Sequence, residues 1–80
     1  MRVLLIEDNE DIAKGLAQSL ESLSYSVDMA LDGEEGLRQS YLAAYDIIIL
    51  DLHLPGLSGI EVGKKIRAQN KTVRIIALSV

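Results

Sequence analysis

Runs of consecutive apolar residues recur along this 80-residue chain, separated by segments with helical spacing. Val3–Ile6 and Ile47–Leu50 contain no polar residue, which is typical of strands buried on both faces of a parallel sheet. Tyr25–Leu31 instead alternates apolar and polar positions, which favours an edge strand. We therefore predict four strands, at Arg2–Glu7, Tyr25–Leu31, Asp46–Asp51 and Val73–Ser79.

Three helices are predicted between these strands. Asn9 is a suitable N-cap for the first, which should end near Ser22 and bury one face formed by Ile12, Leu16, Leu20 and Leu23. After a turn at Asp32-Gly33, the second helix should span Glu34–Leu42, with Leu37 and Tyr41 pointing inward. Ser58 and Glu61 match a capping box and predict a third helix that ends near Asn70.

The resulting order is β-α-β-α-β-α-β, which predicts an α/β doubly wound parallel sheet with right-handed crossovers and helices on both faces. The order ends on the apolar strand Val73–Ser79. We expect its outer edge to be unpaired, and an exposed apolar edge strand is a template for association. The chain is therefore expected to form a two-fold homodimer through this fourth strand.

Composition narrows the possible functions. The 12 acidic and 8 basic residues give a net charge of −4, which argues against a nucleic-acid or membrane-surface role for this segment. The sequence has no cysteine, and no apolar run reaches transmembrane length or resembles a signal peptide. These features favour a cytoplasmic domain without a membrane partner.

Acidic residues follow two of the apolar runs directly. Glu7 and Asp8 end the first strand, and Asp51 ends the third. Ligands bind at the carboxyl ends of open parallel sheets, so neighbouring strands would bring these three carboxylates into one pocket. The negative charges of the three carboxylates repel one another unless a hard cation binds between them, and Mg²⁺ is the cation that oxygen ligands favour. The alternative is that Asp51 is an ordinary acid at a strand end, and that Glu7 and Asp8 are solvated loop acids that favour the N-terminus of the next helix.

The same residues carry a family resemblance. Glu7-Asp8, the stretch from Asp51 to Gly59 (Asp-Leu-His-Leu-Pro-Gly-Leu-Ser-Gly) and Ser79 after the fourth strand together resemble the receiver domain of two-component response regulators. The likeness extends over the whole chain and is strongest for receivers joined to winged-helix DNA-binding domains. It implies a flavodoxin-like receiver fold that is truncated after the fourth strand. Residues 1–80 would be a receiver fragment lacking the last helix, strand and helix.

The resemblance also implies roles for individual residues. Asp51 would accept a phosphoryl group from a histidine kinase, and Ser79 would hydrogen-bond that group. Mg²⁺ would be bound by Asp8, Asp51 and the backbone carbonyl of His53, with Glu7 acting through a water molecule. The chain would be a phospho-acceptor signalling domain rather than an enzyme, although family members catalyse their own Mg²⁺-dependent phosphorylation. DNA would be a partner only through an output domain that is absent from this sequence.

One element of the family pattern has no match. In this family the fifth strand begins with a lysine that pairs with the phosphoryl group, and the lysines here lie on predicted helices or at a helix end: Lys14, Lys64, Lys65 and Lys71. We therefore expect the 80-residue chain to be phosphorylated slowly or not at all.

Two alternative functions remain open. One is a non-catalytic interaction fragment or degenerate receiver. The other is an aspartyl-phosphate phosphohydrolase, which usually has a second acid two residues after its nucleophile. This chain has His53 at that position, which counts against the hydrolase.

Overall fold

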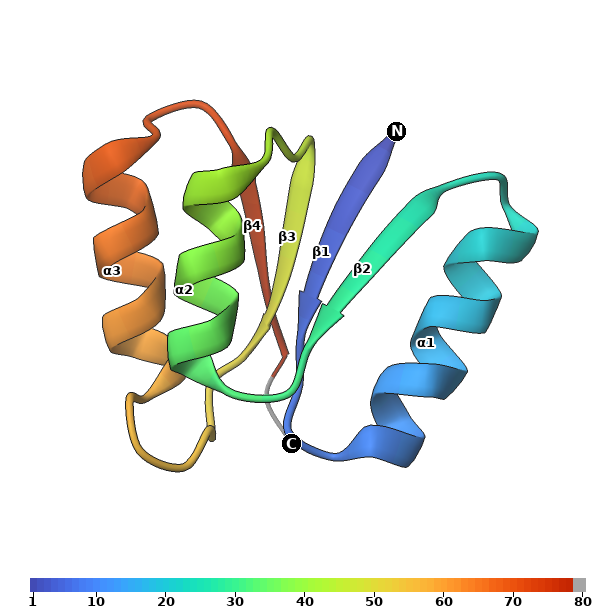
Figure 1. The fold of residues 1–80 in the computed structure, drawn as a ribbon, viewed down its shortest axis with the longest axis horizontal. Helices are drawn as coiled ribbons and strands as arrows, with labels where there is room; N and C mark the ends of the chain where they lie inside the picture. The colour runs from blue at the N-terminus through green and yellow to red at the C-terminus, as the bar shows by residue number, and fades with distance from the viewer. Residues whose placement is uncertain (79–80) are drawn as a thin grey trace.

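The structure is a computed structural model that describes residues 1–78. Strands and helices alternate along the chain in the predicted order (Figure 1). Their bounds are β1 Arg2–Ile6, α1 Glu10–Ser22, β2 Ser26–Ala30, α2 Gly33–Leu42, β3 Ile47–Asp51, α3 Gly59–Gln69 and β4 Arg74–Leu78. Each lies within one residue of the predicted bounds, and the α/β fold class is confirmed. No helix within residues 1–78 combines the length and the apolar character needed to cross a membrane.

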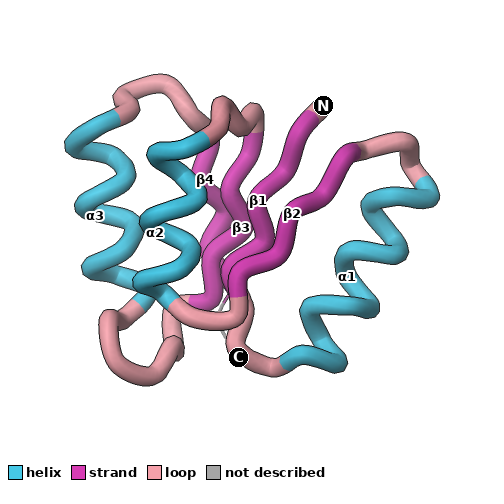
Figure 2. Tube along the Cα trace, in the orientation of Figure 1, coloured by secondary structure: helices cyan, strands magenta, loops and turns pink. Residues whose placement is uncertain are grey.

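The four strands form one parallel sheet in the order β2-β1-β3-β4 (Figure 2). The two strands that end in acidic residues, β1 and β3, are therefore central neighbours. Ile6 pairs with Leu50, so both strands reach their carboxyl ends at the same level of the sheet. This register is what positions the candidate site.

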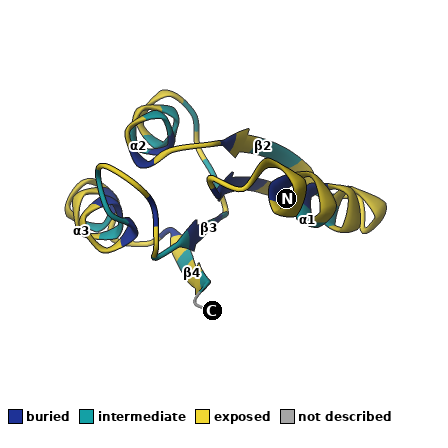
Figure 3. Ribbon diagram, turned by 90° about the horizontal axis from the view of Figure 1, so that it is seen from below, coloured by how far each residue is buried: buried dark blue, intermediate teal, exposed yellow. Residues whose placement is uncertain are grey.

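Helices α2 and α3 cover one face of the sheet, and α1 lies on the other (Figures 1 and 3). The main core lies on the α2–α3 side, because alternate residues of the central strands point there. Its largest fully buried side chains include Leu4, Ile6, Ile48 and Leu50 from the sheet. Val62 and Ile66 of α3 pack against them.

Helix α1 differs from its prediction. Its buried residues are Ala13 and Ala17, whereas Ile12 is 47% exposed and Leu23 is 65% exposed. Alanine has a short side chain, so it allows the helix axis to approach the sheet closely. The larger residues then flank the contact instead of forming it. The prediction that Ile12, Leu16, Leu20 and Leu23 form the buried face was therefore wrong for Ile12 and Leu23.

Helix α2 matches its prediction in part. Leu37 packs against the core as expected, but Tyr41 is 54% exposed and was wrongly predicted to point inward. Gly36 is buried against Ile6, where a Cβ would clash with the isoleucine side chain. The helix therefore contacts β1 through glycine, and its next turn directs Tyr41 outward.

All three helices begin at side-chain caps. Asn9 accepts a hydrogen bond from the Ile12 N–H, as predicted. Ser58 accepts one from the Glu61 N–H, which is one of the two bonds of the predicted capping box; the reciprocal bond from Ser58 N–H to the Glu61 side chain is not formed among the described residues. Asp32 caps α2 by accepting from Glu35 N–H at 2.7 Å. Each cap satisfies one of the backbone donors that a helix start leaves without an intrahelical partner.

Strand β4 forms one border of the sheet. Within residues 1–78 it pairs only with β3, and Ile76 is 49% exposed. β4 therefore lies at the border of the sheet, as expected for the last strand of the predicted order. Ser79, for which a role was predicted, lies outside the described residues.

Candidate metal centre

Three carboxylates meet at the carboxyl ends of β1 and β3. One oxygen from each of Glu7, Asp8 and Asp51 lies within 4.8 Å of the others. Backbone bonds hold the two strand ends in place: Glu7 N–H donates to the Ala30 carbonyl at 3.0 Å, and Leu52 N–H donates to the Leu78 carbonyl at 3.1 Å. The sheet ladder thus continues past the last strand residues and brings together the cluster that the sequence predicts.

Glu7 is the buried member of the cluster, with 6% of its surface exposed. Its Oε2 accepts a hydrogen bond from Asn9 N–H at 3.2 Å. Burial, followed by the hydrogen bond with Asp51, raises the pKa of Glu7 from 4.5 to about 7. Near neutral pH the side chain is therefore partly protonated and can donate that proton to a neighbouring carboxylate.

Asp51 has the opposite tendency. Burial raises its pKa, but the His53 N–H, which donates to Oδ1 at 2.9 Å, and the side-chain hydrogen bonds that Asp51 shares with Glu7 and Asp8 outweigh burial. The net effect is a pKa below the usual aspartate value, so Asp51 is the ionised partner of a protonated Glu7. A single proton shared in this way offsets part of the repulsion within the cluster.

The loop after β3 approaches the cluster closely. Gly56 has a φ of 69°, a left-handed conformation that favours glycine. Gly59 begins α3 directly against the Asp51 carbonyl, where any Cβ would clash with that oxygen. His53 is exposed and its ring is not part of the cluster. Its predicted backbone-carbonyl ligation of Mg²⁺ stays a prediction.

An apolar wall borders the carboxylates, and sequence reasoning did not identify it. A cavity of about 490 Å³ contains the cluster together with Ile12, Leu16 and Leu78. Neither lysine nor arginine lines it within residues 1–78. The sequence does place Ile12 and Leu16 near the carboxylates, because both residues follow the acidic pair on the next helix. The prediction that they belong to the buried face of that helix concealed this second position.

Comparison with known proteins identifies the family. The model of the response regulator receiver domain matches residues 3–80, almost the whole chain. The chain belongs to the response regulator receiver family. Among curated relatives of this receiver domain, response regulator ArlR of Staphylococcus saprophyticus is 38% identical over 78 residues, which are 98% of this chain and 35% of ArlR. The chain thus spans about a third of the length of that relative.

Solved structures give the same result for this receiver domain. Response regulator TrrA of Thermotoga maritima, in complex with Mg²⁺-BeF, matches with a TM-score of 0.92 and 38% identity, covering 95% of this chain and 66% of that one. TrrA in complex with histidine kinase ThkA matches with a TM-score of 0.92 and 38% identity. That second match covers 99% of this chain and 68% of the other.

Proposed function

We propose that this receiver domain accepts a phosphoryl group on Asp51, with Mg²⁺ bound beside it. The observation that carries the proposal is the cluster of three carboxylates at the ends of adjacent central strands. Its ligands are all oxygen atoms, which suits Mg²⁺ and not a thiolate- or imidazole-binding metal. The Mg²⁺-BeF complex of TrrA supports the assignment.

The proposed ligands are Asp8, Asp51 and the backbone carbonyl of His53, with Glu7 acting through a water molecule. These residues fit the cation chemically, because one carboxyl of the cluster must otherwise hold a proton to relieve the repulsion. Bound Mg²⁺ would neutralise charge on the carboxylates and on the incoming phosphoryl oxygens. The proposed ligands would fix the position of the cation, and so the place where the negative charge of the carboxylates and phosphoryl oxygens is neutralised.

Asp51 is the group that reacts in the proposed step. A carboxylate oxygen forms a bond to phosphorus, while the bond from phosphorus to the donor atom breaks and its electron pair leaves with the donor. The His53 N–H holds Oδ1 and so fixes the orientation of the side chain. The lowered pKa keeps Asp51 ionised, as a nucleophile requires. Ser79 is proposed to hydrogen-bond the phosphoryl group, and it lies outside the described residues.

A histidine kinase is the proposed phosphodonor partner, supported by the complex of TrrA with ThkA. The apolar side chains of Ile12, Leu16 and Leu78 would border the phosphoryl group on one side of the cleft.

Phosphorylation is tested with a labelled acyl phosphate and Mg²⁺, followed by mass spectrometry of the intact chain. We expect slow addition of one phosphoryl group to the wild type and none to Asp51→Asn. Asp46→Asn is the matched control, because Asp46 precedes the same strand at its opposite end. Equal labelling of the wild type and Asp51→Asn would contradict the proposal. Complete absence of label in the wild type under excess donor would show that the 80-residue chain does not accept a phosphoryl group.

We also propose that this chain forms a two-fold homodimer through β4. Its outer edge is open within residues 1–78, and Ile76 and Ala77 are exposed there. Edge backbone groups without partners favour pairing with a second copy. Sedimentation velocity across a concentration series should show a dimer for the wild type and a monomer for Ile76→Lys. Met29→Lys, on the opposite edge strand β2, should still dimerise, and a wild type that stays monomeric at high concentration would refute the proposal.

A further inference from the structure

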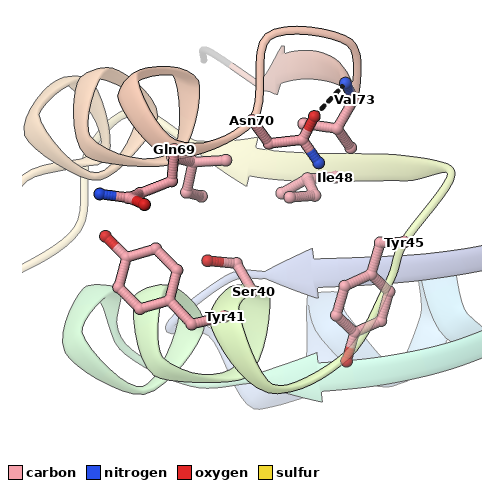
Figure 4. Close-up of a pocket in the computed structure, with 8 residues that line it drawn as sticks. Ser40, Tyr41, Tyr45, Ile48, Gln69, Asn70 and Val73 are labelled. Atoms are coloured by element: carbon pink, nitrogen blue, oxygen red, sulfur yellow. Dashed lines mark hydrogen bonds between the residues drawn. The ribbon is translucent and has the colours of Figure 1, made fainter.

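A second cavity lies at the opposite end of the sheet from the carboxylates. It opens between the C-terminal ends of α2 and α3 and has a volume of about 510 Å³. Its rim is formed by Ser40, Tyr41, Gln69 and Asn70. A second, narrower pocket of about 20 Å³ shares these four residues and is also lined by Tyr45, Ile48, Ile66 and Val73 (Figure 4). The volume of the larger cavity lies within the range of about 300–1,000 Å³ that is usual for small-molecule sites.

Asn70 supplies a donor whose direction is fixed. Its Oδ1 accepts three hydrogen bonds, from Thr72 N–H at 3.0 Å, Thr72 Oγ1 at 3.2 Å and Val73 N–H at 3.1 Å. These bonds determine which end of the amide is oxygen, so the Nδ2 group points toward Ile48 (Figure 4). That NH₂ has no hydrogen-bond partner among the described residues.

The rest of the rim offers neutral polar groups. Tyr41 and Gln69 face each other across the opening (Figure 4), and Ser40 Oγ donates to the Leu37 carbonyl at 2.6 Å. The Ser40 oxygen therefore keeps its lone pairs for an incoming donor. No lining residue of this cavity carries a charge. A charged ligand would lose hydration there without gaining an ionic partner.

We propose that this cavity binds an uncharged, planar heteroaromatic compound that carries a carbonyl acceptor. The acceptor receives the Asn70 Nδ2 donor, and the ring packs between the Tyr41 ring and the Gln69 amide. Aromatic rings prefer offset or edge contacts of this kind. The narrower pocket beside Ile48 and Val73 has room for one water molecule or a methyl-sized substituent. The site is separate from Asp51 and does not depend on the proposed phosphorylation.

The test is an NMR titration of the ¹⁵N-labelled chain with nicotinamide, a neutral ring with an amide carbonyl. We expect saturable shifts of the Tyr41, Gln69, Asn70 and Val73 amides, with a millimolar dissociation constant. Nicotinate, which has the same ring and a negative charge, should bind at least about tenfold more weakly. Shifts that do not saturate, or that centre on the carboxylate cluster, would overturn the proposal, as would equal binding of the two compounds.

Two variants separate the site from general surface binding. Asn70→Asp keeps the oxygen that accepts from Thr72 and Val73 but removes the free donor, so nicotinamide affinity should fall about tenfold or more. Tyr41→Ala removes the exposed ring and should weaken binding without unfolding the chain, because Tyr41 is 54% exposed. Gln18→Ala, an exposed position on α1, should leave the affinity unchanged. Unchanged affinity in Asn70→Asp and Tyr41→Ala would refute the assignment.

Discussion

Replacing Glu7 by glutamine tests how the carboxylate cluster controls stability. The pKa of Glu7 in the folded chain is raised from 4.5 to about 7, first by burial and then by its hydrogen bond with Asp51. A raised folded-state pKa means that the folded state holds this proton more tightly than the unfolded state does. The resulting stability is fully present below pH 4.5 and is lost as the pH rises through 7.

The size of this effect follows from the shift. A difference of about 2.5 pH units, at about 1.4 kcal/mol per unit, corresponds to about 3.5 kcal/mol in the free energy of unfolding. Domains of this size have total stabilities of roughly 5–15 kcal/mol, so the loss is a large fraction of the whole. Asp51, whose pKa is lowered, acts in a separate window, because its contribution is lost only as the pH falls through its folded-state pKa.

The assay is urea denaturation at pH 5, 6, 7 and 8 in the presence of a chelator, followed by circular dichroism. Wild type and Glu7→Gln should differ by less than about 1 kcal/mol at pH 5, and the variant should be more stable by about 3 kcal/mol at pH 8. Adding Mg²⁺ at pH 8 should stabilise the wild type and narrow this gap. Glu21→Gln, at an exposed position on α1, is the control and should follow the wild-type profile. Parallel pH profiles for wild type and Glu7→Gln would refute the reasoning.

Further predictions concern packing, loop geometry, helix propensity and capping. Ile66→Ala should lower the free energy of unfolding by about 3 kcal/mol in urea denaturation, because the side chain is 2% exposed within the core. Gly59→Ala should weaken Mg²⁺-induced NMR shifts at Asp51, since the new Cβ would clash with the Asp51 carbonyl. At Gly15 a new Cβ meets open space, so Gly15→Ala should stabilise α1 by about 0.5–1 kcal/mol. Asn9→Ala should destabilise the chain by about 1 kcal/mol through loss of the α1 cap, and an unchanged urea midpoint would contradict this.

The strands and helix starts were predictable because local chemistry determines them. Every side chain of the run Ile47–Leu50 is apolar, so burial is favoured along its whole length. Strand β3 forms there. Asn9 and Ser58 cap their helices through bonds to residues only three positions away. The meeting of Glu7, Asp8 and Asp51 followed from one further condition, that β1 and β3 are neighbours, which the structure satisfies.

The helix faces and the properties of the site needed the three-dimensional arrangement. The spacing of Ile12 and Leu16 indicates an apolar stripe, but not that Ala13 and Ala17 make the closest approach to the sheet. Tyr41 fits the helical period, yet the buried contact at Gly36 directs it outward. Burial of Glu7 to 6% exposure, and hence its raised pKa, depends on side chains from several segments at once. No local pattern encodes those distances.

The central position of β1 between β2 and β3 has a consequence for the chain as it is being synthesised. Val3 pairs with Ile47, so 44 residues separate the partners at the middle of the sheet. At a translation rate of about 5–20 residues per second, β1 waits roughly 2–9 s for its central neighbour. During that interval only β2 is available to pair with it, and the acidic cluster lacks Asp51. Asp51, one of the proposed Mg²⁺ ligands, therefore joins Glu7 and Asp8 only after β3 has been synthesised.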